Sequence, residues 1–104
     1  MNIENESLKS YTKSLMERLF LILDLTNRAT SEEDLLSIDR FISGLENEIR
    51  GSLPYYSDVK FGNRVPTVLF NISGIKGIPD YNVRRKAILD SNGILEKIFK
   101  SLED

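Results

Sequence analysis

Apolar residues recur every three or four positions along the first part of the chain, which is the spacing of one face of an α-helix. Between residues 6 and 27 this stripe consists of Leu8, Tyr11, Leu15, Leu19 and Ile22. Further apolar residues then widen it, namely Met16, Phe20, Leu23 and Leu25. Because the second half of this segment is apolar on nearly every side, we expect a central helix that its neighbours cover on several sides.

A polar break with the sequence NRATSEED precedes a second helical stripe. Thr30 and Glu33, and likewise Ser31 and Asp34, have the spacing of a capping box, so this helix begins near Ser31. Its apolar positions again lie three and four residues apart, at Leu35, Ile38, Ile42, Leu45 and Ile49, with Phe41 beside them. The segment 50–54, which contains a glycine and a proline, ends the helix.

The last quarter of the chain predicts a third long helix, with Asp80 as its N-cap directly after Pro79. One helical phase contains Val83, Ala87, Ser91, Ile94, Ile98 and Leu102, and Ile88, Leu95 and Phe99 lie beside it. The turn-forming residues Asp90–Gly93 interrupt the pattern. Because the phase continues beyond Gly93, we predict one helix with a weak point, and a candidate kink, at 90–93.

The segment 54–78 fits two structures. A hairpin would turn at Gly62-Asn63, with alternating apolar residues after the turn. A helix would instead use Asn63 as its N-cap, place Pro66 in its first turn and stop just before Gly74. The helix is favoured, because proline removes a ladder hydrogen bond from a paired strand and a lone hairpin needs a sheet to join.

These patterns predict an all-α fold, a compact bundle of about four helices with a long irregular connection at about 54–63. With 104 residues, of which 40% are apolar and 29% charged, the chain fits one globular domain spanning 1–104. Its apolar runs are far shorter than the roughly 20 residues that span a membrane, and its N-terminus is polar and acidic, unlike a secretory signal. We therefore expect a soluble, cytoplasmic protein that does not bind a membrane.

The chain lacks the side chains that most enzymes use. It has neither histidine nor cysteine, which removes the usual general base, the thiol nucleophile and the strongest metal ligands. Its acidic clusters do not have the paired spacing of a metal site, and Asp24, within an apolar run, is the most notable single acid. The Gly74–Gly77 step fits a turn after a helix better than a phosphate or nucleic-acid clamp. We predict a non-enzymatic protein without a metal or cofactor.

The distribution of charge is uneven. Residues 1–50 carry 6 basic and 10 acidic side chains, whereas residues 51–100 carry 8 basic and 4 acidic ones. Arg84, Arg85 and Lys86 lie in the first turns of the last helix, where the helix dipole disfavours cations. Such a locally unfavourable choice can indicate function.

Two interpretations of these cations remain open. Asp80 and Asp90 lie four residues from Arg84 and Lys86 respectively, so the cations can be solvated side chains offset by local ion pairs. Alternatively, a site that faces an anion combines Arg64, Lys76, Arg84 and Arg85.

Tyr55 and Tyr56 follow Pro54 in the predicted connection. Exposed tyrosines beside basic residues are typical of interface hot spots and of base-stacking platforms. Equally, one tyrosine can cover the end of the bundle while the other lies on its surface.

We hypothesise that the chain is a small protein-binding module, such as an adaptor, inhibitor, immunity protein or antitoxin-like partner. Its binding face would consist of Tyr55, Tyr56, Arg64, Lys76, Arg84 and Arg85, and its protein partner would offer an acidic patch. One alternative is nucleic-acid binding through the basic second half, against which the overall acidity counts. Another is a homodimer in which two chains share the stripe of Leu35, Ile38, Ile42, Leu45 and Ile49.

Overall fold

The computed structural model describes residues 3–102, which form four α-helices and two short 3-10 helices, with no strand among these residues. The elements are α1 (Ile3–Arg28), α2 (Glu32–Ser52), η1 (Leu53–Tyr56), η2 (Gly62–Arg64), α3 (Val65–Ser73) and α4 (Tyr81–Ser101). They form an elongated bundle of 45 × 21 × 19 Å. The predicted all-α bundle is confirmed, and the hairpin alternative is wrong. None of these helices is long and apolar enough to cross a membrane.

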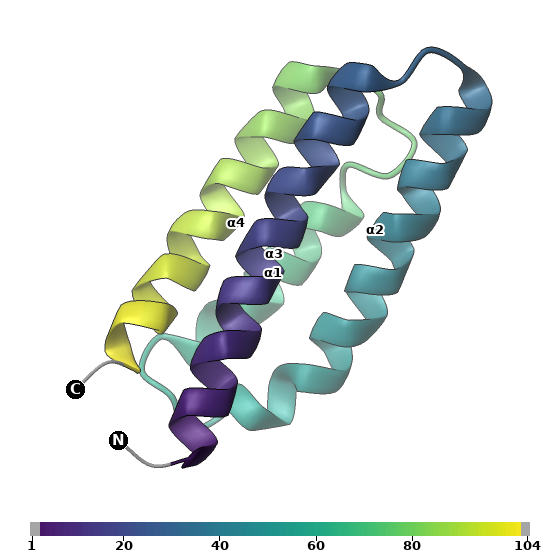
Figure 1. Cartoon of the computed structure of the whole chain (residues 1–104). Helices are drawn as coiled ribbons and strands as arrows, with labels where there is room; N and C mark the ends of the chain where they lie inside the picture. Colours follow the sequence, from purple (N-terminus) through teal and green to yellow (C-terminus); the bar gives the residue numbers. More distant parts are fainter. Residues whose placement is uncertain (1–2, 103–104) are drawn as a thin grey trace.

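The helices pack around a core to which each contributes fully buried side chains, such as Leu19, Ile42, Ile72 and Ile88. α1 runs antiparallel to α4, and α3 packs against both α2 and α4 (Figure 1). The packing between α1 and α2 is much less extensive than that between α1 and α4, although only a short connection separates α1 from α2. The surface over α1 and α2 is therefore the least closed side of the bundle.

Local sequence signals set most helix ends. The Ser31 hydroxyl accepts a hydrogen bond from the backbone N–H of Asp34 at the start of α2 (3.1 Å). Asp80 caps α4 by accepting from two backbone N–H groups. Pro66 lies in the first turn of α3, and Gly74 is its C-cap residue. Each of these positions agrees with the sequence prediction, because each depends only on residues within one turn of the helix end.

The connection before α3 is more ordered than the sequence indicates. The predicted irregular segment 54–63 lies largely within η1, η2 and the turns that join them. Asn63 is not the N-cap of α3, because it lies inside η2, and the N-cap position, Arg64, makes no side-chain capping bond. Phe61 reverses the chain with a positive φ of 67°. Since η2 continues directly into α3, the helix needs no separate cap.

α1 is less enclosed than predicted. Phe20 is 47% exposed and Leu21 is also exposed, although the residues on either side of this pair, Leu19 and Ile22, are fully buried. The packing of α1 comes mainly from α4 and α2, which leaves part of its outer surface uncovered. The expectation of a helix covered on several sides was therefore wrong for this part of α1.

The apolar stripe of α2 belongs to the core of its own chain. Ile38, Ile42, Leu45 and Ile49 are all buried, and Leu35 is half-buried. They pack within the bundle, so they are not available to a second chain. Two chains could share this stripe only if each bundle opened.

α4 runs without interruption through the turn-forming residues 90–93, so the prediction of one helix is confirmed. Ser91 and Asn92 are buried rather than exposed. The Asn71 side chain donates to the Ser91 hydroxyl (3.2 Å), and Asn92 donates to the carbonyl of Met16 in α1 (3.5 Å). These contacts with α3 and α1 engage the polar side chains that would otherwise favour a turn.

Candidate functional site

The six residues predicted to form one face lie at opposite ends of the bundle. Tyr55 and Tyr56 lie in η1, directly after α2, and Arg64 lies in η2, whereas Lys76 lies in the loop before α4 and Arg84 and Arg85 in its first turns. The end of α2 and the start of α4 lie at opposite ends of the bundle (Figure 1). We call these the Tyr55 end and the Arg84 end. Because the bundle is 45 Å long, the two groups do not form a common surface.

Arg84 is buried, with only 1% of its surface exposed. Its Nε donates to the carbonyl of Ile78 (2.7 Å), and Nη1 donates to the hydroxyl of Thr26 (3.0 Å). Its Nη2 donates to the Asp39 carboxylate (3.0 Å) and to the carbonyl of Ile75 (3.3 Å). These bonds tie α4 to α1, to α2 and to the α3–α4 loop. The hypothesis that Arg84 belongs to an exposed anion site was therefore wrong.

Asp39 explains how the bundle holds a buried cation. One of its carboxylate oxygens pairs with Arg84, and the other accepts the backbone N–H of Gly77 (3.0 Å). Gly77 has a φ of +76°, a conformation that glycine adopts without the steric cost of a side chain. Arg84 thus pairs with a residue of α2, and the expected partner Asp80 caps α4 instead. The Gly74–Gly77 step serves as a turn after a helix.

Lys76 and Arg85 remain on the surface of the Arg84 end. Lys76 pairs with Glu46, whose carboxylate also accepts a hydrogen bond from Ser73. Burial alone would raise the pKa of Glu46, but the hydrogen bonds and the charge of Lys76 together lower it below its ordinary value. Arg85 forms no hydrogen bond or ion pair with the described residues, so it is the free cation of the predicted set at this end.

The two adjacent tyrosines have opposite environments. Tyr56 is fully buried, and its hydroxyl lies 2.7 Å from that of Thr12. Because the Thr12 proton is donated to the carbonyl of Leu8, Tyr56 is the donor in this pair. Burial raises the pKa of Tyr56. Tyr55 is 74% exposed, so only Tyr55 can take part in a surface contact without a change of fold.

Arg64 belongs to a basic and aromatic cluster at the Tyr55 end. Its guanidinium carbon lies 5.8 Å from the ring centroid of Phe61, and Lys60 Nζ lies 5.3 Å from the same ring. The Ser101 hydroxyl, which donates to the carbonyl of Ile98, lies 3.5 Å from the carbonyl oxygen of Lys60, so this cluster lies beside the end of α4. Arg64 is therefore distant from the other cations of the predicted face.

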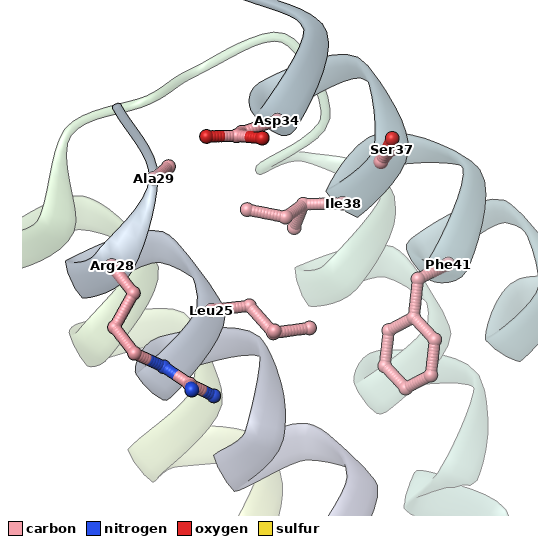
Figure 2. A pocket seen from close by; sticks show the side chains of 7 residues that line it. All are labelled: Leu25, Arg28, Ala29, Asp34, Ser37, Ile38 and Phe41. Atoms are coloured by element: carbon pink, nitrogen blue, oxygen red, sulfur yellow. The ribbon is translucent and has the colours of Figure 1, made fainter. Parts of the chain in front are cut away.

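Surface pockets occur at both ends of the bundle among the described residues. One, of about 450 Å³, lies between the end of α1 and the start of α2, where Leu25, Ile38 and Phe41 project into the space between the helices (Figure 2). Another, of about 230 Å³, lies over Asp39 and Arg84. Since Arg84 and Asp39 are already bonded to each other and to the loop, this pocket has no unpaired charge at its base.

A pocket of about 800 Å³, larger than these two, lies at the Tyr55 end between α1, the end of α2 and η1. We call it the Tyr55 pocket. It is lined by Glu4, Asn5, Ser7, Leu8, Tyr11, Glu48, Gly51, Ser52, Tyr55, Asp58 and Val59. Its apolar and aromatic members form a surface on which side chains can pack, and its ionisable members other than the tyrosines are all acidic.

One wall of the Tyr55 pocket already engages a cation of the chain itself. The Arg18 guanidinium forms an ion pair with Glu48, and its carbon lies 6.0 Å from the ring centroid of Tyr11. Partial burial, together with the negative charge of Glu48, raises the pKa of Tyr11. The pairing of an aromatic ring with a carboxylate is a common way to bind guanidinium and ammonium groups.

The pocket combines residues that the sequence analysis did not connect. Leu8 and Tyr11 were assigned to the apolar stripe of the first helix, yet both line the pocket with Glu48 and Tyr55. A sequence signal was present in Gly51, a small residue one turn before the exposed tyrosine. The α1 contribution comes from more than 40 positions earlier, which no local pattern reveals.

The acidic side chains of residues 3–102 form no cluster of three or more that is suited to a metal ion. Asp24 is exposed and pairs with Arg28 one turn away, as expected of a solvated acid near a helix end. The prediction of a non-enzymatic protein remains a prediction.

No protein-family model, no curated protein and no solved structure matches this chain.

Proposed function

We propose that this chain is a small non-enzymatic protein-binding module, of the adaptor, inhibitor, immunity or antitoxin type, and that the Tyr55 pocket receives a segment of its partner. The observation that carries the proposal is the exposure of Tyr55, at 74%, on the rim of this pocket of about 800 Å³. Aromatic side chains that meet a pocket are enriched among residues that contribute most to binding.

The shape of the pocket supports a peptide segment as its ligand. Its volume of about 800 Å³ is near the upper part of the range of about 300–1,000 Å³ that ligand pockets occupy. Leu8, Tyr11 and Val59 are half-buried within it, so a partner can cover apolar surface that the bundle leaves in water. The described residues contain no strand, which removes addition to a sheet edge as a binding mode and favours packing of a helix in a groove.

Affinity capture from a lysate of the source cell, with nuclease present, tests this proposal. The informative variant is Tyr55→Ser, and Phe70→Ser is its matched control because Phe70 is an equally exposed aromatic residue, at 78%, outside the pocket. We expect a protein partner that is retained by the wild type and by Phe70→Ser but lost with Tyr55→Ser. Retention by all three proteins would contradict the assignment of the pocket.

A second candidate function, nucleic-acid binding, is favoured by the basic and aromatic cluster at the Tyr55 end. Lys60 and Arg64 lie over the ring of Phe61, and Lys9 Nζ lies 5.1 Å from the ring centroid of Phe99. Cations beside aromatic rings form the kind of surface on which single-stranded nucleic acids stack.

Fluorescence anisotropy with single-stranded DNA and RNA over a salt series separates this candidate from the first. Phosphate contacts predict an affinity that falls steeply as salt increases. Lys60→Gln with Arg64→Gln should make that dependence shallower, whereas Arg28→Gln with Arg85→Gln, two exposed cations elsewhere, should not. An affinity that the first pair of substitutions leaves unchanged would exclude the cluster as a nucleic-acid site.

A further inference from the structure

We infer that the segment received by the Tyr55 pocket is a cationic amphipathic helix, with lysine or arginine side chains flanking an apolar stripe. This inference rests on the proposed function and adds the chemistry of the partner. The evidence consists of the charge of the lining, the pairing of Arg18, and the open space over Gly51.

The lining of the pocket has one sign of charge. Glu4 comes from the first turn of α1, Glu48 from α2 and Asp58 from the turn after η1, so the acids come from three separate parts of the chain. No lysine or arginine lines the pocket. A partner that enters this lining gains from positive charge and is disfavoured by negative charge.

Arg18 shows how a partner's cation can be bound. Its guanidinium packs over the Tyr11 ring and pairs with Glu48 at one wall of the pocket. Glu4 and Asp58, in contrast, form no hydrogen bond or ion pair with the described residues. Two lining carboxylates therefore remain available to cations from outside the chain.

Gly51 provides room for the partner's backbone. It lies in the last turn of α2, and a Cβ atom built on it meets no atom within 4 Å. The open space at Gly51 leaves room for an incoming helix to pack against the last turn of α2. The apolar members Leu8, Tyr11, Tyr55 and Val59 then contact the apolar stripe of the incoming helix.

A labelled model peptide tests the inference directly. The probe is a fluorescein-labelled helix of about 18 residues, roughly 27 Å long, composed of leucine and lysine at helical spacing. Two companion peptides replace lysine with glutamate, or leucine with serine. We expect the leucine–lysine peptide to bind the full chain, and each companion to bind about tenfold more weakly or less, because each lacks either the charge or the apolar stripe.

Matched variants locate the binding. Gly51→Lys places a cation and added bulk in the pocket, and Gly93→Lys makes the same change at an equally open glycine of α4. Glu4→Gln with Asp58→Asn removes two lining charges, and Glu17→Gln with Glu33→Gln removes two exposed charges elsewhere. We expect the pocket variants to weaken binding about tenfold and the controls to remain within about twofold of the wild type. Thermal unfolding confirms that each variant is folded.

Other outcomes overturn the inference in distinguishable ways. Equal weakening by pocket and control variants would show a general attraction to an acidic protein. Tighter binding of the glutamate peptide, sensitive to Gly51→Lys, would leave the pocket as the binding site but reverse the partner's charge. If no peptide binds, yet the lysate partner is still lost with Tyr55→Ser, the proposed function stands and the cationic helix is wrong. A doubled mass in light scattering that Gly51→Lys abolishes would identify a second copy of the chain as the occupant.

Discussion

At the Arg84 end of the bundle, charged groups are buried and bonded to each other, whereas at the Tyr55 end the buried polar contact joins two uncharged hydroxyls. Arg84 pairs with Asp39, and the nearby Glu46 pairs with Lys76. At the other end, Tyr56 donates to Thr12, and its neighbour Tyr55 projects into solvent. The first end encloses Arg84 and Glu46 and keeps Lys76 and Arg85 on its surface, whereas the second leaves an acidic and aromatic pocket open.

This difference indicates where the molecule can accept a partner. Removing or displacing one member of a buried ion pair strongly destabilises the fold. The Arg84 end therefore cannot rearrange around a ligand without a large loss of stability. The Tyr55 pocket needs no such rearrangement, because its exposed members are not required for packing. The two ends should also respond differently to substitution and to pH.

The largest expected effect on stability comes from removing the buried cation of the Arg84 end. Arg84→Met should lower the free energy of unfolding by about 3 kcal/mol, because the Asp39 carboxylate and two loop carbonyls lose their donor. Arg85→Met changes the same residue type one position later on the surface, and should stay within about 0.5 kcal/mol of the wild type. Urea unfolding measures both, and similar losses for the two variants would contradict the structural role of Arg84.

A slightly smaller effect is expected at the Tyr55 end. A Cβ atom on Gly62 would lie 2.0 Å from the carbonyl oxygen of Tyr56, so the backbone must move to accommodate Gly62→Ala. We expect a loss of about 2 kcal/mol in the free energy of unfolding. Gly44→Ala, at an open position of α2, should instead gain up to about 1 kcal/mol, since alanine favours the helix. Thermal unfolding of the two variants should therefore show shifts of opposite sign.

Tyr56→Phe changes the buried hydroxyl contact at the Tyr55 end. It should lower the free energy of unfolding by about 1 kcal/mol, because it removes the hydrogen bond to Thr12. It should also change the response to alkaline pH. Burial raises the pKa of Tyr56 in the folded state, so above the unfolded value of 10.0 the unfolded chain loses a proton that the folded chain keeps. Stability therefore falls as pH rises above 10.0.

In Tyr56→Phe this alkaline loss should be smaller, but it should not vanish, because burial also raises the pKa of Tyr11. Denaturant unfolding between about pH 9 and pH 11 measures the slope. Tyr55→Phe serves as the control and should leave both stability and slope close to those of the wild type. If the dependence of stability on pH is unchanged in Tyr56→Phe, burial of the Tyr56 hydroxyl is not a cause of the alkaline loss.

The smallest effect is expected for Glu46→Gln, at roughly 0.5 kcal/mol near neutral pH, because the cost of burial offsets much of the gain from Lys76 and Ser73. The lowered pKa of Glu46 stabilises the folded state above the unfolded value of 4.5, and this contribution is lost as pH falls through the folded pKa. Acid titration of unfolding should thus be less steep below pH 4.5 in the variant than in the wild type. If the stability of the variant declines as steeply as that of the wild type, other carboxylates are responsible for the loss of stability in acid.

Sequence patterns predicted the parts of the fold that depend on nearby residues. The helix phases, the caps at Ser31 and Asp80 and the proline in the first turn of α3 each involve residues within about one turn. For the same reason the helix was correctly preferred to the hairpin. Asn63 was misassigned because η2 leads into α3, which the local cap pattern does not reveal.

The candidate site was less predictable, because its environments depend on distant pairs. Arg84 is buried only because Asp39, 45 positions earlier, meets it in space, and Tyr56 is buried because it meets Thr12, 44 positions earlier. No periodic pattern distinguishes Tyr55 from Tyr56 or Arg84 from Arg85. The sequence therefore could not separate the surface residue from its buried neighbour in either pair.

The bond from Arg84 Nε to the carbonyl of Ile78 also gives the α3–α4 loop a spectroscopic signal of its own. The proton on Nε, whose nitrogen lies 2.7 Å from the acceptor oxygen, is shielded from solvent and exchanges with water only when its surroundings open. In nitrogen-labelled protein, that proton should persist after transfer to heavy water while those of solvent-exposed arginines disappear at once. In the wild-type protein, the exchange of this one proton therefore measures how often the Arg84 end opens.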